Sequence, residues 1–145
     1  MDIDRIVERL RAALRDGPPL RLAVLFGSGA RGALRGDSDL DVGIVPTDAE
    51  LPLVDELDLQ VRLTSALGRH VDLVRLDRAT TLLRYQVACA HVPIVADPPH
   101  ELSRFVARAG IEHADLRVLR DPVAERFRRR RLEQARPATR GPERA

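Results

Sequence analysis

Two short motifs in the first third of the sequence have residue types that could hold phosphate groups and a metal ion. Gly27-Ser28 follows an apolar run, and Asp39-Leu40-Asp41 comes after a spacer of ten residues. If the second motif lies on a strand, Asp39 and Asp41 share one face while Leu40 points into the core, because alternate strand residues point to opposite faces. Two carboxylates side by side repel each other unless a cation lies between them, and Mg²⁺ prefers such oxygen ligands.

A third carboxylate is predicted at the same place. The segment HVDLVRL, residues 70–76, is typical of a strand in which Val71 and Leu73 face the core and Asp72 faces the other way. If this strand pairs beside the earlier one, its carboxylate joins the other two. Metal ions held by such a cluster could clamp a nucleoside triphosphate and activate an attacking hydroxyl. Backbone N–H groups of the Gly-Ser turn would then bind the phosphates.

The same glycine-rich segment also fits a second pattern. Gly27, Gly29 and Gly32 spell the G-x-G-x-x-G fingerprint of dinucleotide-binding proteins. That fingerprint opens a crossover helix between parallel strands, and a crossover takes about a dozen residues or more. Only six residues separate Gly32 from Asp39, so no full helix fits between them. We therefore expect the flanking strands to be antiparallel or nearly adjacent, and we reject the dinucleotide interpretation.

Helices and strands are predicted to alternate along the chain, which indicates an α/β domain. Apolar residues at helical spacing predict the helices, and short apolar or alternating runs bounded by turn residues predict the strands. Gly68 is expected to end a helix, and Cys89 is expected in the core. The expected helices lie near 3–14, 52–67, 78–90, 100–119 and 122–134, and the expected strands at 20–26, 39–46, 70–76 and 92–96.

Length and composition are ordinary for one globular domain. The chain has 145 residues, 44% hydrophobic and 32% charged, and we expect a single domain over residues 1–134 and a disordered tail over 135–145. No apolar run approaches the roughly 20 residues of a membrane span, and the acidic N-terminus does not fit a signal peptide, so a cytoplasmic location is expected. All 24 basic residues are arginine, which excludes a Walker A lysine and Schiff-base chemistry.

The stretch FGSGARGALRGDSDLDVGIV, with HVDLVRL further on, resembles the minimal nucleotidyltransferases. More narrowly, it is similar to the MntA-type antitoxins of HEPN/MNT toxin–antitoxin systems. The resemblance covers roughly residues 1–120. It implies a polymerase beta-like nucleotidyltransferase fold, a small mixed sheet flanked by helices, with C-terminal helices. It also implies Mg²⁺-dependent transfer of AMP from ATP to a tyrosine hydroxyl of a cognate HepT toxin, an RNase of the HEPN class.

The resemblance assigns roles to individual positions. It places Gly27 and Ser28 at the phosphates. It makes Asp39, Asp41 and Asp72 the metal ligands and catalytic residues. Two further nucleotide-binding residues are expected in the same segment, with a simpler alternative for each: Arg31, in the "ARG" often seen in this family, could be an exposed charge, and Ser38 could be a turn residue.

Several alternatives stay open. The protein could neutralise its toxin by binding alone, or it could be a small-molecule nucleotidyltransferase of the aminoglycoside type. Only the segment from about 100 to 134 follows the core, which favours a substrate brought by a partner protein and makes helix 100–119 a candidate docking surface. The arginines at 126–131 fit a solvated helix face or a contact with an acidic partner or RNA, although direct nucleic-acid binding is not expected. A homodimer and a hetero-oligomer are both compatible with the sequence.

Overall fold

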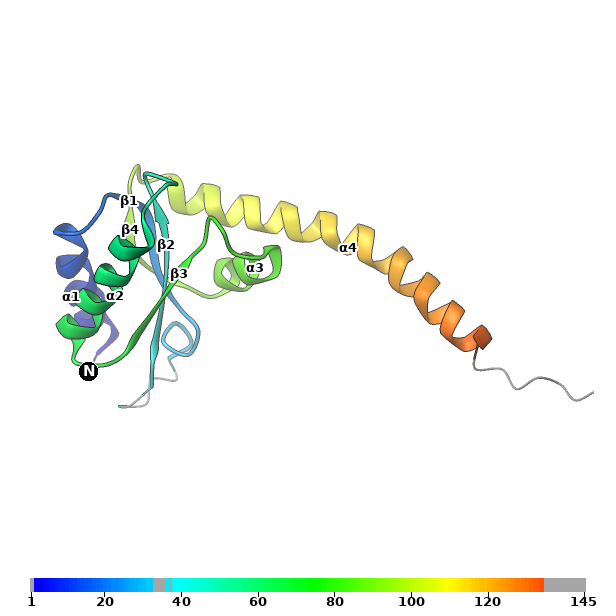
Figure 1. Ribbon diagram of the computed structural model, residues 1–145, viewed down its shortest axis with the longest axis horizontal. Helices are drawn as coiled ribbons and strands as arrows, with labels where there is room; N and C mark the ends of the chain where they lie inside the picture. Colours follow the sequence, from blue (N-terminus) through cyan, green and yellow to red (C-terminus); the bar gives the residue numbers. More distant parts are fainter. Residues whose placement is uncertain (1, 33–35, 37, 135–145) are drawn as a thin grey trace, which may run out of the picture.

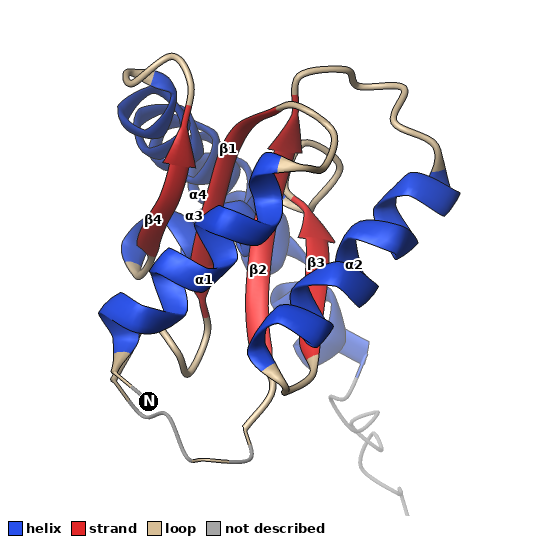
Figure 2. Cartoon of the chain, turned by 90° about the vertical axis from the view of Figure 1, so that its left-hand side faces the viewer, coloured by secondary structure: helices blue, strands red, loops and turns tan. Residues whose placement is uncertain are grey.

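The computed structural model describes residues 2–32, 36 and 38–134. Within them, a four-stranded sheet has the order β3-β2-β1-β4, with α1 and α2 on one face and α3 and α4 on the other (Figures 1 and 2). The predicted tail over 135–145 lies outside the described residues. The elements in chain order are α1 (Ile3–Arg15), β1 (Leu20–Phe26), β2 (Leu40–Pro46), α2 (Leu53–Leu67), β3 (Val71–Arg75), α3 (Thr81–Cys89), β4 (Val92–Ala96) and α4 (Glu101–Gln134).

The sheet is mixed, as predicted. Strand β1 pairs antiparallel with β2 and with β4, while β2 pairs parallel with β3. The antiparallel pairing of β1 and β2 agrees with the short link between them. The parallel pair needs a crossover, which α2 supplies. In the register of these strands, Asp41 lies opposite Phe26 on β1 and opposite Asp72 on β3.

The larger part of the core lies between the sheet and the pair α1 and α2. The apolar stripe of α1 is buried through Ile6 and Leu10, and Leu40, Val42 and Ile44 of β2 pack against it. Gly68 ends α2 in the left-handed conformation with φ of 65°, as the sequence predicts. The residues of β2 that alternate with this buried set must point to the opposite face.

That opposite face has a smaller core at one end. Leu22, Val24, Leu76 and Val87 are buried there, with Phe105 of α4 packed against them. Figure 1 shows α4 continuing well beyond the body of the domain on this side of the sheet. The beginnings of β2 and β3 lie at the other end of this face, and Asp39, which directly precedes β2, is exposed.

Two expectations about helices are wrong. A single helix, α4, replaces the two predicted over 100–119 and 122–134, and Pro122 lies inside it. Proline lacks an N–H group and disfavours a helix interior, yet the helix continues on both sides of Pro122. Cys89 is exposed rather than in the core, because the buried face of α3 passes through Val87 and a residue two positions further lies on nearly the opposite side.

The end of β3 carries a buried charge that the sequence did not indicate. Arg75 is buried and forms an ion pair with Asp77 at 2.7 Å and a longer one with Glu56 of α2 at 3.6 Å. Its Nη2 also donates to the carbonyl oxygen of Ala49 at 3.0 Å. The guanidinium therefore ties the segment after β2, helix α2 and the turn after β3 together.

Candidate active site

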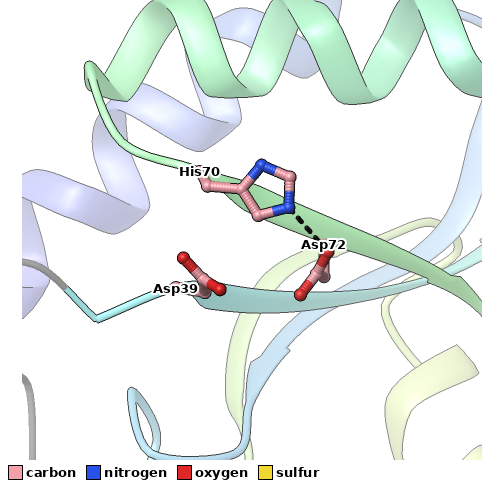
Figure 3. A group of neighbouring side chains, drawn as sticks. All are labelled: Asp39, His70 and Asp72. Carbon is pink, nitrogen blue, oxygen red and sulfur yellow. Dashed lines mark hydrogen bonds and ion pairs between the residues drawn. The ribbon is translucent and has the colours of Figure 1, made fainter.

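The structure brings the three predicted carboxylates together at the beginnings of β2 and β3. Asp41 and Asp72 are partners in the parallel register. Asp39 lies two residues before Asp41, so the two side chains point to the same face. One ligand atom from each of Asp39, Asp72 and His70 lies within 4.8 Å of the other two (Figure 3). Because the residues between them face the α1 and α2 layer, the carboxylates project from the face that carries α3 and α4.

Gly27 lies directly against Asp41. It follows the last residue of β1 and has φ of +70°, a conformation that glycine adopts without strain. A Cβ atom at this position would lie 2.4 Å from Oδ2 of Asp41. The sequence predicted a glycine that allows close approach to a phosphate. In the structure, the close approach is that of the Asp41 carboxylate, so the glycine turn and the acidic cluster form one site.

The electrostatics of the cluster favour a cation. The pKa of Asp41 lies above its ordinary value, mainly because the carboxyl is partly buried, and the charges of Asp72 and Asp39 raise it further. Each of these causes disfavours the charged form of the carboxyl. A bound divalent cation would offset all three, and the oxygen donors present fit such an ion.

Backbone contacts hold the two acidic segments in place. The N–H of Leu40 donates to the carbonyl oxygen of His70 at 3.0 Å. Nε of Arg69 donates to the carbonyl oxygen of Ser38 at 3.0 Å, and Nη2 of the same side chain donates there as well. The N–H of Val71 donates to Oγ1 of Thr64 at 3.2 Å. The bonds of Leu40 and Arg69 fix the beginning of β2 relative to the beginning of β3, and so Asp39 relative to Asp72, while the Thr64 bond ties β3 to α2.

The other predicted nucleotide-binding residues surround this cluster in sequence. Ser28 and Arg31 are exposed in the turns that follow β1. Ser38 is partly buried, and its described hydrogen bonds are those that its carbonyl oxygen accepts from Arg69. The turns over residues 27–32 leave the Ser28 hydroxyl accessible, and the nucleotide-binding roles of Ser28, Arg31 and Ser38 stay predictions.

Sequence reasoning gave His70 no role, but the structure places it in the cluster. Its Nε2 lies 2.8 Å from Oδ1 of Asp72, and about half of each side chain is exposed. The available signal was the spacing His-x-Asp at the start of a strand, which puts the two side chains on one face. Such spacing is common by chance, so it pointed to no function on its own.

A cavity of about 270 Å³ lies between the sheet and α4. Its charged lining residues pair with one another: Arg84 lies 2.6 Å from Glu112 and Arg21 lies 3.7 Å from Glu101. Val45 also lines it and lies four positions along β2 from Asp41, which is about 13 Å, and none of the three carboxylates lines it. The cavity is therefore separate from the carboxylates.

The fold and the acidic cluster together define a nucleotidyltransferase. The family model described as polymerase beta, nucleotidyltransferase matches residues 8–98, and the chain belongs to this family. The matched segment runs from within α1 to just after β4, so it contains the glycine turn and all three carboxylates.

Individual relatives are more specific. The protein adenylyltransferase MntA of Shewanella oneidensis is 41% identical over 75 residues, a segment covering 51% of this chain and 53% of that protein. The chain thus matches about half the length of this curated relative.

Two solved structures are similar over nearly the whole of their matched chains. The first is a crystal structure of a toxin–antitoxin with AMP-PNP, at 28% identity and a TM-score of 0.72, covering 83% of this chain and 97% of that chain. The second is a tri-AMPylated Shewanella oneidensis HEPN toxin in complex with MNT antitoxin, at 25% identity and a TM-score of 0.68, covering 87% and 98%. Among the described residues, no helix is both long and apolar enough to cross a membrane.

Proposed function

We propose that this protein is a Mg²⁺-dependent adenylyltransferase that moves AMP from ATP to a hydroxyl, expected to be that of a tyrosine, on a cognate HEPN-type toxin, and so acts as an antitoxin. The observation that carries the proposal is that Asp41 lies opposite Asp72 and against Gly27, while Asp39 and Asp72 lie in one cluster with His70. The name of the Shewanella oneidensis relative and the two toxin–antitoxin structures support it.

ATP is held by its phosphates at the turn that follows β1. Backbone N–H groups near Gly27 and Ser28 bind the phosphates, and the Ser28 hydroxyl and the Arg31 guanidinium add contacts from the exposed side of the turn. Ser38 is the remaining proposed contact, close in sequence to the carboxylates. This arrangement brings the triphosphate next to the acidic cluster.

The carboxylates from the two strands are proposed to have different roles, in metal binding and in proton transfer. Asp39 and Asp41, from the beginning of β2, would hold the metal, with Asp72 of β3 as the third ligand. When bound, Mg²⁺ would stabilise the negative charge that develops on the α-phosphate. Asp72 comes from the neighbouring strand, is partly exposed, and is the group proposed to accept the proton of the incoming hydroxyl.

In the transfer itself, the hydroxyl oxygen of the partner protein forms a bond to the α-phosphorus of ATP. The bond from that phosphorus to the oxygen bridging to the β-phosphate breaks, and pyrophosphate leaves. The hydroxyl proton passes to the carboxylate of Asp72. The products are the AMP-modified toxin and pyrophosphate.

A protein substrate fits this chain better than a small molecule does. The cavity under α4 is lined by internal ion pairs and by none of the three carboxylates, so it is not a substrate pocket that opens onto the proposed metal site. The long helix α4 instead offers exposed apolar side chains, Ile111, Phe127 and Leu132, among arginines. These suit contact with a partner protein.

Two expectations from the sequence complete the proposal. Residues 1–134 form one domain, in which the helical extension contributes to partner binding. A cytoplasmic location is proposed because the reaction consumes ATP and its toxin substrate is an RNase.

The test is to mix the purified protein with the HEPN-type toxin encoded beside it, ATP and Mg²⁺, and to measure the intact mass of the toxin. We expect added AMP units with the wild type and none with Asp72→Asn, while calorimetry shows that Asp72→Asn still binds Mg·ATP. Undiminished transfer by Asp72→Asn would remove it from the catalytic set. A toxin that is neutralised without added AMP would instead support a binding antitoxin.

A further inference from the structure

The acidic cluster contains a donor of a different chemical kind. His70 directly precedes β3, and its Nε2 lies 2.8 Å from Oδ1 of Asp72. One carboxylate oxygen of Asp39 lies within 4.8 Å of a ligand atom on each of these two residues. Figure 3 shows the imidazole over the same side of the strands as the two carboxylates. About half of the His70 side chain is exposed, so an ion can reach it.

We propose that His70 is a ligand of the metal ion at this site, and that it shifts the preference of the site from Mg²⁺ toward first-row transition ions, Mn²⁺ in particular. The inference rests on the proposed function, since it takes the carboxylates as the metal site. It concerns which ion binds and through which atoms.

The three side chains lie close enough together to reach one ion after small movements. Adjacent ligands of an octahedral ion with bonds of about 2.1 Å lie about 3.0 Å apart, and opposite ligands lie about 4.2 Å apart. The 2.8 Å between His70 and Asp72 is close to the first value. The 4.8 Å limit that includes Asp39 exceeds the second only slightly. An ion can therefore take the place of the hydrogen bond between His70 and Asp72 with small side-chain movements.

The donor chemistry decides the preference. Carboxylate oxygens suit Mg²⁺, Ca²⁺ and Mn²⁺, whereas an imidazole nitrogen suits transition metals and adds little for Mg²⁺. Affinity at a mixed nitrogen and oxygen site increases along the series from Mn²⁺ to Cu²⁺. Mn²⁺ lies at the weak end of this series, but it is the member that also suits the carboxylate ligands that Mg²⁺ prefers. A site made of carboxylates alone would lack this contribution.

The first experiment detects the nitrogen directly. Mn²⁺ is added to the purified protein without nucleotide, and electron spin-echo envelope modulation measures coupling between the ion and nitrogen nuclei. We expect ¹⁴N modulation in the wild type, its replacement by a ¹⁵N pattern when histidine is labelled, and its loss in His70→Gln. His100→Gln is the matched control, because His100 is exposed before α4, at the opposite end of the sheet from the carboxylates, and should keep the modulation.

The second experiment measures the preference. Calorimetric titrations with Mn²⁺ and with Mg²⁺ give a ratio of affinities, which we expect to fall about tenfold in His70→Gln and to stay unchanged in His100→Gln. Bound Mn²⁺ without nitrogen coupling in the wild type, or an unchanged ratio in His70→Gln, would overturn the inference and leave His70 as a hydrogen-bond partner of Asp72. If only this inference is wrong, AMP transfer in Mg²⁺ is still observed. If the proposed function is wrong, no AMP transfer is observed, but the nitrogen coupling of bound Mn²⁺ is still present.

Discussion

The carboxylate of Asp41 occupies the space into which any side chain at Gly27 would project, since a Cβ there would lie 2.4 Å from Oδ2. Gly27 also has a positive φ of 70°. These two constraints are separable, because Gly32 has nearly the same conformation, with φ of 72°, and a Cβ at Gly32 would meet nothing within 4 Å. The pair of glycines therefore offers a matched test of the contact with Asp41.

We expect Gly27→Ala to lower the free energy of unfolding by more than Gly32→Ala does. Each substitution forces a side chain into the left-handed region, at a cost of about 1 kcal/mol, but only the first displaces a carboxylate. Urea denaturation of both variants measures the difference. Equal losses would mean that Asp41 moves aside freely. Adding Asp41→Ala to Gly27→Ala should recover the extra loss.

Asp41→Asn is expected to stabilise the protein when no divalent cation is present. The pKa of Asp41 is raised from 3.8 by burial and by the charges of Asp72 and Asp39. A carboxyl whose pKa is raised in the folded protein lowers the free energy of unfolding when it ionises. The protein therefore has its full stability below the ordinary pKa of the group and loses part of it as the pH rises through the raised pKa. The Asn variant avoids that loss, so its melting temperature should exceed that of the wild type at pH 7, and the gap should close in acid.

Mg·ATP should raise the melting temperature of the wild type but not that of a variant that lacks the metal ligands. Binding to the folded state raises the melting temperature of the wild type, and Asp39→Asn/Asp41→Asn should not gain. Thermal scans with and without Mg·ATP test both statements. An equal gain in the wild type and the double variant would contradict the assignment of the carboxylates as metal ligands.

Asp77→Asn should destabilise the protein through Arg75. Burial raises the pKa of Asp77, but the hydrogen bond and the charge of Arg75 outweigh this and lower it below 3.8. Removing the charge leaves the buried guanidinium with weaker partners, at a cost of about 2 kcal/mol. Because the folded pKa is lowered, the stabilisation is present above 3.8 and is lost as the pH falls through the lowered value.

Urea denaturation at several pH values measures this effect. The gap between wild type and Asp77→Asn should be constant near neutral pH and narrow only below about pH 4. Asp48→Asn is a suitable control, because Asp48 is exposed and the described hydrogen bond of its side chain is the one it accepts from the N–H of Glu50. A gap that persists unchanged in strong acid would show that the charge of Asp77 does not act on Arg75.

Ser28→Ala should weaken ATP binding by about 1 kcal/mol, the net contribution of one hydrogen bond. The loss is small because backbone N–H groups provide most of the proposed phosphate contact. Calorimetry with Mg·ATP measures it, and Ser65→Ala in α2, also exposed, serves as the comparison. A complete loss of binding would indicate that the hydroxyl, and not the backbone, is the principal contact.

Local patterns predicted much of the fold. Strands at 20–26 and 92–96 have the predicted bounds, because apolar runs between turn residues are short-range signals. The shared face of Asp39 and Asp41 follows from the period of a strand, and its meeting with Asp72 follows from the pairing of β2 and β3. The strand bounds and the shared face depend only on neighbours in sequence. The meeting with Asp72 depends on the pairing of two strands that a predicted helix connects.

Contacts between distant residues were not predictable in the same way. The ion pair of Arg75 with Glu56 needs the packing of α2 against β3 before it can form. His70 joins the site only because its side chain turns toward Asp72, a choice of rotamer that spacing does not fix. The continuity of α4 through Pro122 was also missed, because two separate helices were expected there.

From Arg117 onward, the described side chains of α4 are exposed, and the helix continues past the body of the domain (Figure 1). Substitutions there remove little packing, so they cost the fold little. The acidic cluster, in contrast, depends on strands whose alternate residues are buried in the core. Selection can therefore rewrite the outer half of α4 as a partner diverges while leaving the chemistry untouched, and sequence drift in this family is expected to concentrate along that half.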